Sequence, residues 1–225
     1  MTTGSPTDAM LTVDVVSDVV CPWCYIGKRR LEAALATLSE RAPAREVRVR
    51  WHPFQLNPDV PESGIDRREY VERKFGGAAR AAQVYDRVRN AGLSVDIPFA
   101  FDAIKRQPNT RDAHRLIAWA QSTAAPAAVD ALVERLFRAY FLEGRYVGDR
   151  DELARLAAEC GLDSIEAQAL LESDRFGAEV RASNEHAHAA GIDGVPFFIF
   201  DGKVAVGGAQ TPDILLDAID AAAQR

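Results

Sequence analysis

Two cysteines separated by two residues are the side chains of this sequence best suited to chemistry. Cys21 and Cys24 enclose Pro22 and Trp23, and such a pair binds a metal ion, forms a disulfide or exchanges thiols with a partner. Cys21 stands where a strand-like run ends and a helical pattern begins, so the dipole and unpaired N–H groups of that helix favour a thiolate there. Cys24 lies one turn further and faces the fold. We interpret Cys21 as the attacking thiol and Cys24 as the resolving thiol of a thiol–disulfide exchange.

A metal site and a structural disulfide are the less favoured interpretations of this pair. Zinc would need two further ligands, and no remaining candidate stands at a metal-ligand spacing from the pair. Those candidates are Cys160, His52, His114, His186 and His188. A structural disulfide would close only a short loop and would constrain little. The sequence therefore predicts no metal and no cofactor beyond the redox-active pair itself.

The segments before residue 191 predict the elements that position the pair. Residues 11–17 have the β-branched composition of a strand, and the helical pattern after the motif stops before Pro43. Residues 47–51 then alternate as a half-buried strand does, which completes a β-α-β unit. From residue 61 to about residue 190 the pattern is helical almost throughout, and we interpret it as five or six helices. Asn109 and Asp149 are expected as helix N-caps.

The C-terminal segment returns to strands. Residues 196–200 and 204–206 flank Asp201-Gly202, a turn pair that predicts a β-hairpin. Thr211-Pro212 then opens a last helix. The order of elements predicts an α/β chain with a thioredoxin-like fold and an inserted all-helical domain.

We expect two structural units in this chain. The thioredoxin-like domain is discontinuous and comprises residues 11–60 and 191–225, and the inserted helical domain comprises residues 61–190. A Cys-x-x-Cys motif beside a β-α-β pattern is typical of redox proteins.

The composition excludes several classes of function. The 225 residues carry a net charge of −6 with both signs interleaved, which gives no basic face for nucleic acid. The first ten residues lack the charged and apolar parts of a secretory signal, and no apolar run reaches the roughly 18 residues of a membrane helix. With only three cysteines, the sequence favours a cytoplasmic, reducing location and no membrane partner. The expected partner is a thiol or disulfide of a protein or small molecule, and the oligomeric state is left open.

Four segments resemble the DsbA family, and more narrowly its cytoplasmic FrnE-type branch. They are SDVVCPWCYIGK (17–28), PFQLNP (53–58), NTRDAHRL (109–116) and GIDGVPFF (191–198). The resemblance implies a thioredoxin fold with an inserted helical domain and dithiol–disulfide chemistry at Cys21 and Cys24. It also implies that Pro196 is the cis-proline facing the motif, with the Val195 backbone available to an extended partner strand.

Two other functions are kept as alternatives. The 2-hydroxychromene-2-carboxylate isomerases and kappa-class glutathione transferases share this architecture, use glutathione, and usually have serine where Cys21 stands. A glutathione-dependent isomerase or transferase is therefore the alternative function, although both cysteines are present here. The second alternative is a peptide-binding module without catalytic turnover. Such a module would keep its biological activity in a protein that lacks both thiols.

Trp23, Val195 and Pro196 are the predicted substrate-binding residues. Trp23 is expected near the surface, where it shields Cys24 and offers an aromatic face to a partner.

Three further residues receive structural interpretations. Asp18 is expected to cap the first helix or the turn before it, with tuning of the Cys21 pKa or relay of a proton to Cys24 as the less favoured role. His114 is interpreted as a packed histidine, and Cys160 as a small apolar residue at a helix end.

Overall fold

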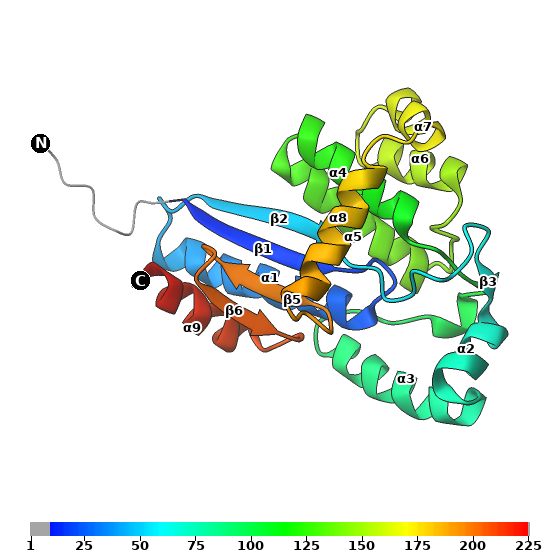
Figure 1. The fold of residues 1–225 in the computed structure, drawn as a ribbon. Helices are drawn as coiled ribbons and strands as arrows, with labels where there is room; N and C mark the ends of the chain where they lie inside the picture. The colour runs from blue at the N-terminus through cyan, green and yellow to red at the C-terminus, as the bar shows by residue number, and fades with distance from the viewer. Residues whose placement is uncertain (1–9, 225) are drawn as a thin grey trace, which may run out of the picture.

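The protein is built on a four-stranded mixed sheet with helices on both faces and a helical block at one end (Figure 1). The computed structural model describes residues 10–224. The central strand β1 (Leu11–Ser17) runs parallel to β2 (Val47–Pro53) and antiparallel to β5 (Phe197–Phe200). The hairpin partner of β5 is β6 (Val204–Gly207), so the strand order is β2-β1-β5-β6 and the edges are β2 and β6.

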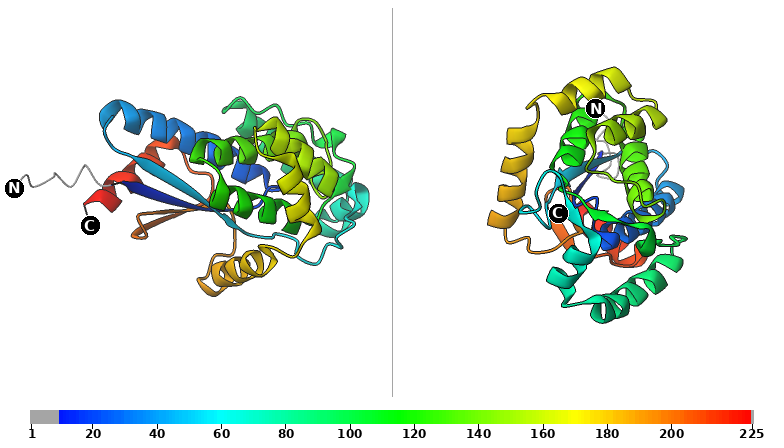
Figure 2. Two further views of the ribbon diagram at one scale, coloured as in Figure 1. Left: turned by 90° about the horizontal axis from the view of Figure 1, so that it is seen from above. Right: turned by 90° about the vertical axis from the view of Figure 1, so that its right-hand side faces the viewer.

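Helices α1 (Pro22–Arg41) and α9 (Pro212–Ala223) cover one face of the sheet, and α8 (Gly177–Ala189) crosses the other (Figure 2). Alternation along β5 directs Phe198 and Phe200 into the same core as Leu215 and Ile219 of α9. A smaller apolar cluster forms under α8 from Val16, Phe54, Ala187 and Ile192. The sheet therefore has a large core on the α1 side and a smaller one on the α8 side.

The expected C-terminal elements are confirmed. Asp201 and Gly202 form the turn between β5 and β6 with φ of 50° and 67°, the left-handed conformation that Asp-Gly hairpin turns adopt. Thr211 occupies the N-cap position of α9, and Pro212 is its first helical residue.

The helical block contains more helices than the five or six expected. Besides α8 it comprises α2 (Arg67–Phe75), α3 (Ala78–Leu93), α4 (Arg111–Thr123), α5 (Pro126–Phe141), α6 (Arg150–Glu159) and α7 (Ser164–Glu172), with a 3-10 turn at Phe101–Ala103. The short helices α2 and α7 each begin at an aspartate, Asp66 and Asp163, whose carboxylate accepts two backbone N–H groups. These caps start new helices within a run that reads as continuous from its composition.

Two other details of the block differ from expectation. Asp149 caps α6 as predicted, accepting the Glu152 N–H, but Thr110 rather than Asn109 occupies the N-cap position of α4. Asn109 instead accepts the Arg111 N–H from one residue outside the helix, at 2.9 Å. A two-residue ladder also joins β3 (Ile65–Asp66) to β4 (Arg106–Gln107), which periodicity does not reveal.

The core continues from the sheet into the helical block. Tyr25 of α1 stacks on Phe137 of α5 with ring centroids 5.0 Å apart, and its hydroxyl donates to Glu134 at 2.8 Å. The buried Lys28 ammonium donates to Asp130 at 3.1 Å across the same interface. The predicted boundary between the thioredoxin-like domain and the inserted helical domain, residues 61–190, therefore crosses a packed core. The division into two domains stays a prediction.

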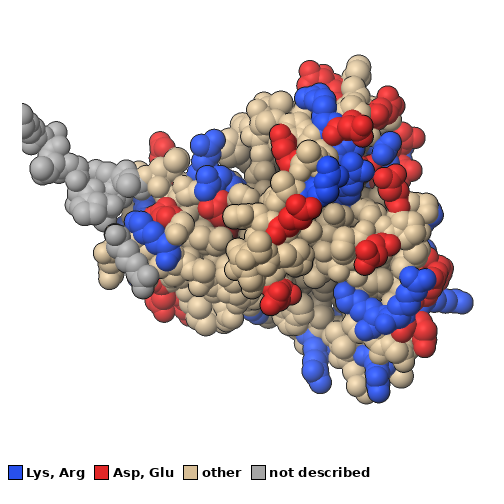
Figure 3. All heavy atoms as spheres, viewed as in Figure 1, with Lys and Arg blue, Asp and Glu red and all other residues tan. Residues whose placement is uncertain are grey.

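Charged side chains of both signs are interspersed over the face seen in Figure 3. This mixture agrees with the interleaved charges of the sequence. Within the described residues, no helix combines the length and apolar character needed to cross a membrane.

The second turn of α1 lies directly against the start of β5, where Pro196 and Phe198 stand. A β-carbon on Gly27 would lie 2.8 Å from Pro196 Cγ and 3.1 Å from Phe198 Cζ. Glycine is therefore required for this approach, because a proline ring has little freedom to move away.

Replacing Gly27 with alanine should destabilise the fold. Overpacking costs about 1–3 kcal/mol, which outweighs the roughly 0.5–1 kcal/mol that alanine gains over glycine inside a helix. Urea unfolding should show a net loss, whereas Gly194→Ala, where nothing lies within 4 Å of the added carbon, should change stability by less than about 0.5 kcal/mol. A Gly27→Ala protein at least as stable as the wild type would contradict this packing.

Candidate functional site

Cys21 lies at the boundary between β1 and α1. It is the N-cap residue of the helix, with extended backbone angles of φ −93° and ψ 113°, and Pro22 is the first helical residue. Its carbonyl accepts the Cys24 N–H at 3.0 Å, and no side chain among residues 10–224 caps the helix. The cysteine sulfur thus stands where the helix dipole favours a negative charge.

Both sulfurs are free thiols, and both are buried. The exposed fraction is 4% for Cys21 and 1% for Cys24. Burial raises the pKa of Cys24 well above its usual value, and the adjacent Cys21 raises it further. Hydrogen bonding from the Ser17 side chain and the Asp18 backbone acts in the opposite direction. The exposed fractions of the two thiols are nearly the same. The difference in reactivity that we expect between them comes from the position of Cys21 at the helix start and from the raised pKa of Cys24.

The Val195–Pro196 segment meets Cys21 from the far end of the sequence. The Val195–Pro196 peptide bond is cis, as expected. The Cys21 thiol lies 3.6 Å from the Val195 carbonyl oxygen, towards which its S–H can donate. Trp23, between the two cysteines, is 39% exposed, as expected for an aromatic side chain at the surface of this turn.

Asp18 does not cap α1 with its side chain. It is 0% exposed, and its Oδ2 accepts the Leu56 N–H at 2.9 Å, while its backbone carbonyl accepts the Cys21 N–H. The side chain therefore fixes the loop after β2 beneath the motif. Sequence reasoning missed this role because the contact joins residues that are distant along the chain.

His114 is buried, as expected, but its nearest charged neighbour was not predicted. Its Nε2 lies 3.3 Å from Asp18 Oδ1. The two atoms are close but poorly aligned, so neither has a hydrogen-bond partner within the described part of the chain. The NTRDAHRL segment predicted a packed histidine, and nothing in its spacing indicated a carboxylate neighbour 96 positions away along the chain.

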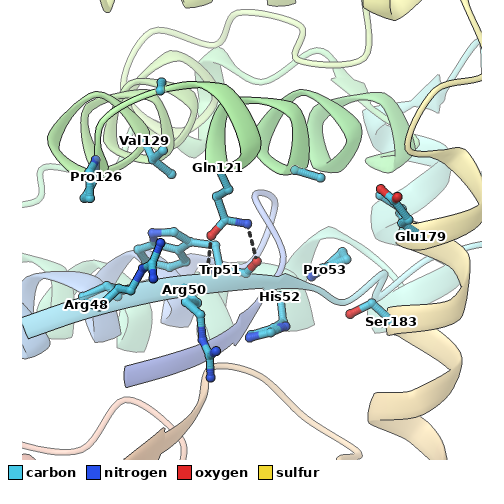
Figure 4. Close-up of a pocket in the computed structure, with 14 residues that line it drawn as sticks. Arg48, Arg50, Trp51, His52, Pro53, Gln121, Pro126, Val129, Glu179 and Ser183 are labelled. Atoms are coloured by element: carbon cyan, nitrogen blue, oxygen red, sulfur yellow. Dashed lines mark hydrogen bonds between the residues drawn. The ribbon is translucent and has the colours of Figure 1, made fainter. Parts of the chain in front are cut away.

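The other sequence-derived candidates lie outside this arrangement. Cys160 is the half-buried C-cap residue of α6, and burial raises the pKa of its thiol. Within residues 10–224, no group of three or more His, Cys, Asp and Glu side chains is placed as metal ligands would be. A cavity of about 320 Å³ beside β2 includes neither cysteine of the motif in its lining (Figure 4).

The raised pKa of Cys24 predicts a pH dependence of stability for the reduced protein. The folded chain holds the thiol proton more tightly than the unfolded chain, so this contribution is fully present below the unfolded thiol pKa of about 8.5. It is lost as the pH rises above that value. The test uses the range from about pH 8.5 to about pH 10, because tyrosines begin to ionise at the upper end. In this range the free energy of unfolding should fall more steeply for wild type than for Cys24→Ala. Parallel curves for wild type and Cys24→Ala in urea unfolding would contradict the assignment. Cys160→Ala removes a thiol whose pKa is raised less, so it should flatten the curve less than Cys24→Ala does.

Comparisons with known proteins agree with this geometry. A family model described as a DSBA-like thioredoxin domain matches residues 12–220. The crystal structure of a probable DsbA oxidoreductase from Streptomyces coelicolor is 30% identical, with a TM-score of 0.82 over 94% of this chain and 89% of that one.

Two more distant structures share the fold. One is a 2-hydroxychromene-2-carboxylate isomerase, with 16% identity and a TM-score of 0.66 over 93% of this chain and 95% of that one. The other is the cytosolic disulfide reductase DsbM from Pseudomonas aeruginosa with GSH, with 19% identity and a TM-score of 0.59 over 95% and 96% of the two chains. The family match spans nearly the whole of the described chain, and the protein belongs to the family of DSBA-like thioredoxin domains.

Proposed function

We propose that this protein is a thiol–disulfide oxidoreductase that exchanges a dithiol and a disulfide through Cys21 and Cys24. The observation that carries the proposal is the pairing of one thiol at the helix start with a second, buried thiol one turn behind it. The first position favours a nucleophilic thiolate, and the second keeps its thiol protonated until it is needed.

The proposed cycle has two exchange steps. The Cys21 thiolate attacks a partner disulfide and forms a mixed disulfide, with release of one partner thiol. Cys24 then attacks the Cys21 sulfur, which releases the second partner thiol and leaves the Cys21–Cys24 disulfide. The reverse sequence oxidises a partner dithiol, and the physiological direction is set by the reduction potentials of the partners.

Trp23, Val195 and Pro196 are proposed to bind the partner. The exposed indole of Trp23 offers an apolar surface beside the sulfurs, and the Val195 carbonyl lies within 3.6 Å of Cys21. An extended peptide that reached Cys21 would pass this backbone, where main-chain hydrogen bonding suits many partner sequences.

Glutathione is the candidate small-molecule partner, and a glutathione-dependent isomerase or transferase is the second candidate function. The shared fold with an isomerase and with a reductase whose structure was solved with GSH supports both ideas. The presence of two thiols in this chain favours the redox function.

We also propose a reducing, cytoplasmic location and a two-unit organisation. Three free thiols and a cytosolic relative of the same fold support the location. The continuous sheet formed by the two ends of the chain supports a discontinuous thioredoxin-like domain, residues 11–60 and 191–225, interrupted by residues 61–190.

Insulin reduction by dithiothreitol tests the redox function. Wild-type protein should accelerate the reaction, and Cys21→Ser should fall to the uncatalysed rate because the attacking sulfur is lost. Cys160→Ser, which removes a thiol far along the chain from the motif, should retain the wild-type rate. Equal rates for wild type and Cys21→Ser would shift the assignment to the glutathione-dependent alternative, which isomerisation of 2-hydroxychromene-2-carboxylate with added glutathione would test.

Alkylation with iodoacetamide tests the roles of the two thiols. In the reduced protein near neutral pH, Cys21 should be modified first because it stands at the start of α1, and Cys24 last because its pKa is raised. Peptide mass spectrometry gives the three rates separately, and in urea the three rates should converge. Faster modification of Cys24 than of Cys21 in the folded protein would reverse the assignment.

A further inference from the structure

The strand β2 lies at one edge of the four-stranded sheet and leaves part of its backbone without a neighbouring strand. Within residues 10–224 it pairs only with β1, which runs parallel to it. The N–H of Phe54, directly after β2, donates to Ser17 of β1. Because successive residues of a strand direct their N–H and C=O groups to opposite sides, those of Val49 and Trp51 point away from β1. Such an edge can pair with another extended chain.

Gln121 of α4 pairs with this edge as a residue of a neighbouring strand would. Its Oε1 accepts the Trp51 N–H at 2.7 Å, and its Nε2 donates to the Trp51 carbonyl at 3.0 Å (Figure 4). A side-chain carboxamide offers the same kinds of donor and acceptor as a peptide group. The contact therefore shows that an amide fits against the outer side of β2. Among residues 10–224, no backbone or side-chain group takes the equivalent position beside Val49.

The outer side of β2 borders the cavity of about 320 Å³, which we call the β2 groove. Residues 48–53 of β2, the region of α4 and α5, and α8 form its walls (Figure 4). The apolar side chains of the lining are Val49, Ala118, Ala124, Pro126, Val129 and Val180. An extended peptide suits such a groove, because its main chain pairs with the strand edge and its alternate side chains enter apolar surroundings.

The charges of the groove favour a peptide that carries a carboxylate. The Arg50 guanidinium is already held by Asp14, with Nε–Oδ1 and Nη2–Oδ2 distances of 2.6 and 2.7 Å. Arg48 is exposed and forms no ion pair within the described part of the chain. Glu179 is the acidic residue of the lining and lies at the opposite end of the groove (Figure 4). A carboxylate of the peptide is therefore stabilised at the Arg48 end.

A second copy of this chain is a poorer occupant of the groove. If two β2 edges paired antiparallel about Val49, Arg48 of each copy would lie opposite Arg50 of the other. Like charges directly opposite each other destabilise a strand pair. Asp14 compensates Arg50 in each copy but leaves the two Arg48 side chains uncompensated.

We propose that the β2 groove binds an extended, acidic polypeptide segment, which joins the sheet as an additional strand beside Val49. Its main chain pairs with the Val49 N–H and C=O, its apolar side chains pack against the α4–α5 wall, and its carboxylate lies near Arg48. Gln121 closes the site at Trp51, where it already occupies the pairing position. The inference goes beyond the proposed function, because neither cysteine of the motif lines the groove and binding there uses no thiol.

Titration with a peptide of sequence Glu-Val-Thr-Val-Glu, blocked at both ends, tests the site. Amide NMR spectra of the isotope-labelled protein should show the Val49 N–H moving downfield as it gains a hydrogen bond, while the amides of Cys21 and Trp23 stay in place. An unchanged Val49 signal at millimolar peptide would overturn the proposal. A Val49 signal that moves with protein concentration alone would also overturn it, because the groove would then join two copies of this chain.

Two matched peptides separate main-chain pairing from charge. The same peptide N-methylated at its three central residues has no main-chain donors there and should bind at least about fivefold more weakly. Lys-Val-Thr-Val-Lys should bind at least about threefold more weakly at low salt, and the difference should shrink as salt is added. Equal affinity of the first two peptides would exclude strand addition, and equal affinity of the acidic and basic peptides would exclude the acidic partner.

Arg48→Glu tests the charge from the side of the protein. The variant should prefer the lysine peptide over the glutamate peptide, a reversal that a general loss of structure would not produce. Arg80→Glu, at an exposed arginine of α3, is the matched control and should keep the wild-type preference. Retention of that preference in Arg48→Glu would overturn the assigned position of the carboxylate.

The peptide comparisons use wild-type protein, so they decide the proposal even if a variant does not fold. None of the peptides contains cysteine, and their binding is independent of insulin reduction. Failure of the redox function therefore appears as lost insulin reduction with the Val49 shift intact, whereas failure of the groove proposal appears as an unshifted Val49 with insulin reduction intact.

Discussion

The contact between the first two turns of α1 and the Val195–Pro196 segment is the constraint on which the site depends. Gly27 permits the helix to reach the proline ring, and the same approach brings the Cys21 sulfur to the Val195 carbonyl. The segment that opens β5 would otherwise lie too far from the motif to border it. A residue with no side chain, six positions beyond the reactive cysteine, therefore sets where a partner backbone can lie relative to the sulfur.

The helical block is held to α1 by aromatic and ionic contacts on its outer side. Tyr25 follows Cys24 directly and stacks on Phe137, while Lys28 is buried against acidic side chains of α5 and its own helix. Burying an ammonium without these carboxylates would be costly, so Lys28 fixes the register of α5 against α1. The block thereby forms one wall of a small cavity that Ser17 of β1 and His114 of α4 both line.

Much of this arrangement could be predicted from the sequence because it follows from local chemistry. The β-branched run before the motif, the Pro22 helix start and the Asp201-Gly202 turn each act within a few residues, and each has the expected structure. The cysteine spacing likewise indicated a redox pair before any contact was known. The number of helices in the block was underestimated, because side-chain caps such as Asp66 and Asp163 interrupt runs whose composition stays helical.

Tertiary structure alone decided which distant groups surround the two thiols. The sequence by itself determined the order of the elements and the place of Cys21 at a helix start. It also determined that the chain returns to the sheet with the strand that follows Val195-Pro196. It did not determine that Asp18 holds Leu56 or that His114 approaches Asp18, since these contacts join residues 38 and 96 positions apart. Periodicity and capping describe interactions within one element, whereas the burial of the His114 imidazole depends on how α4 packs against β2 and the β1–α1 connection, and that packing is a property of the whole core.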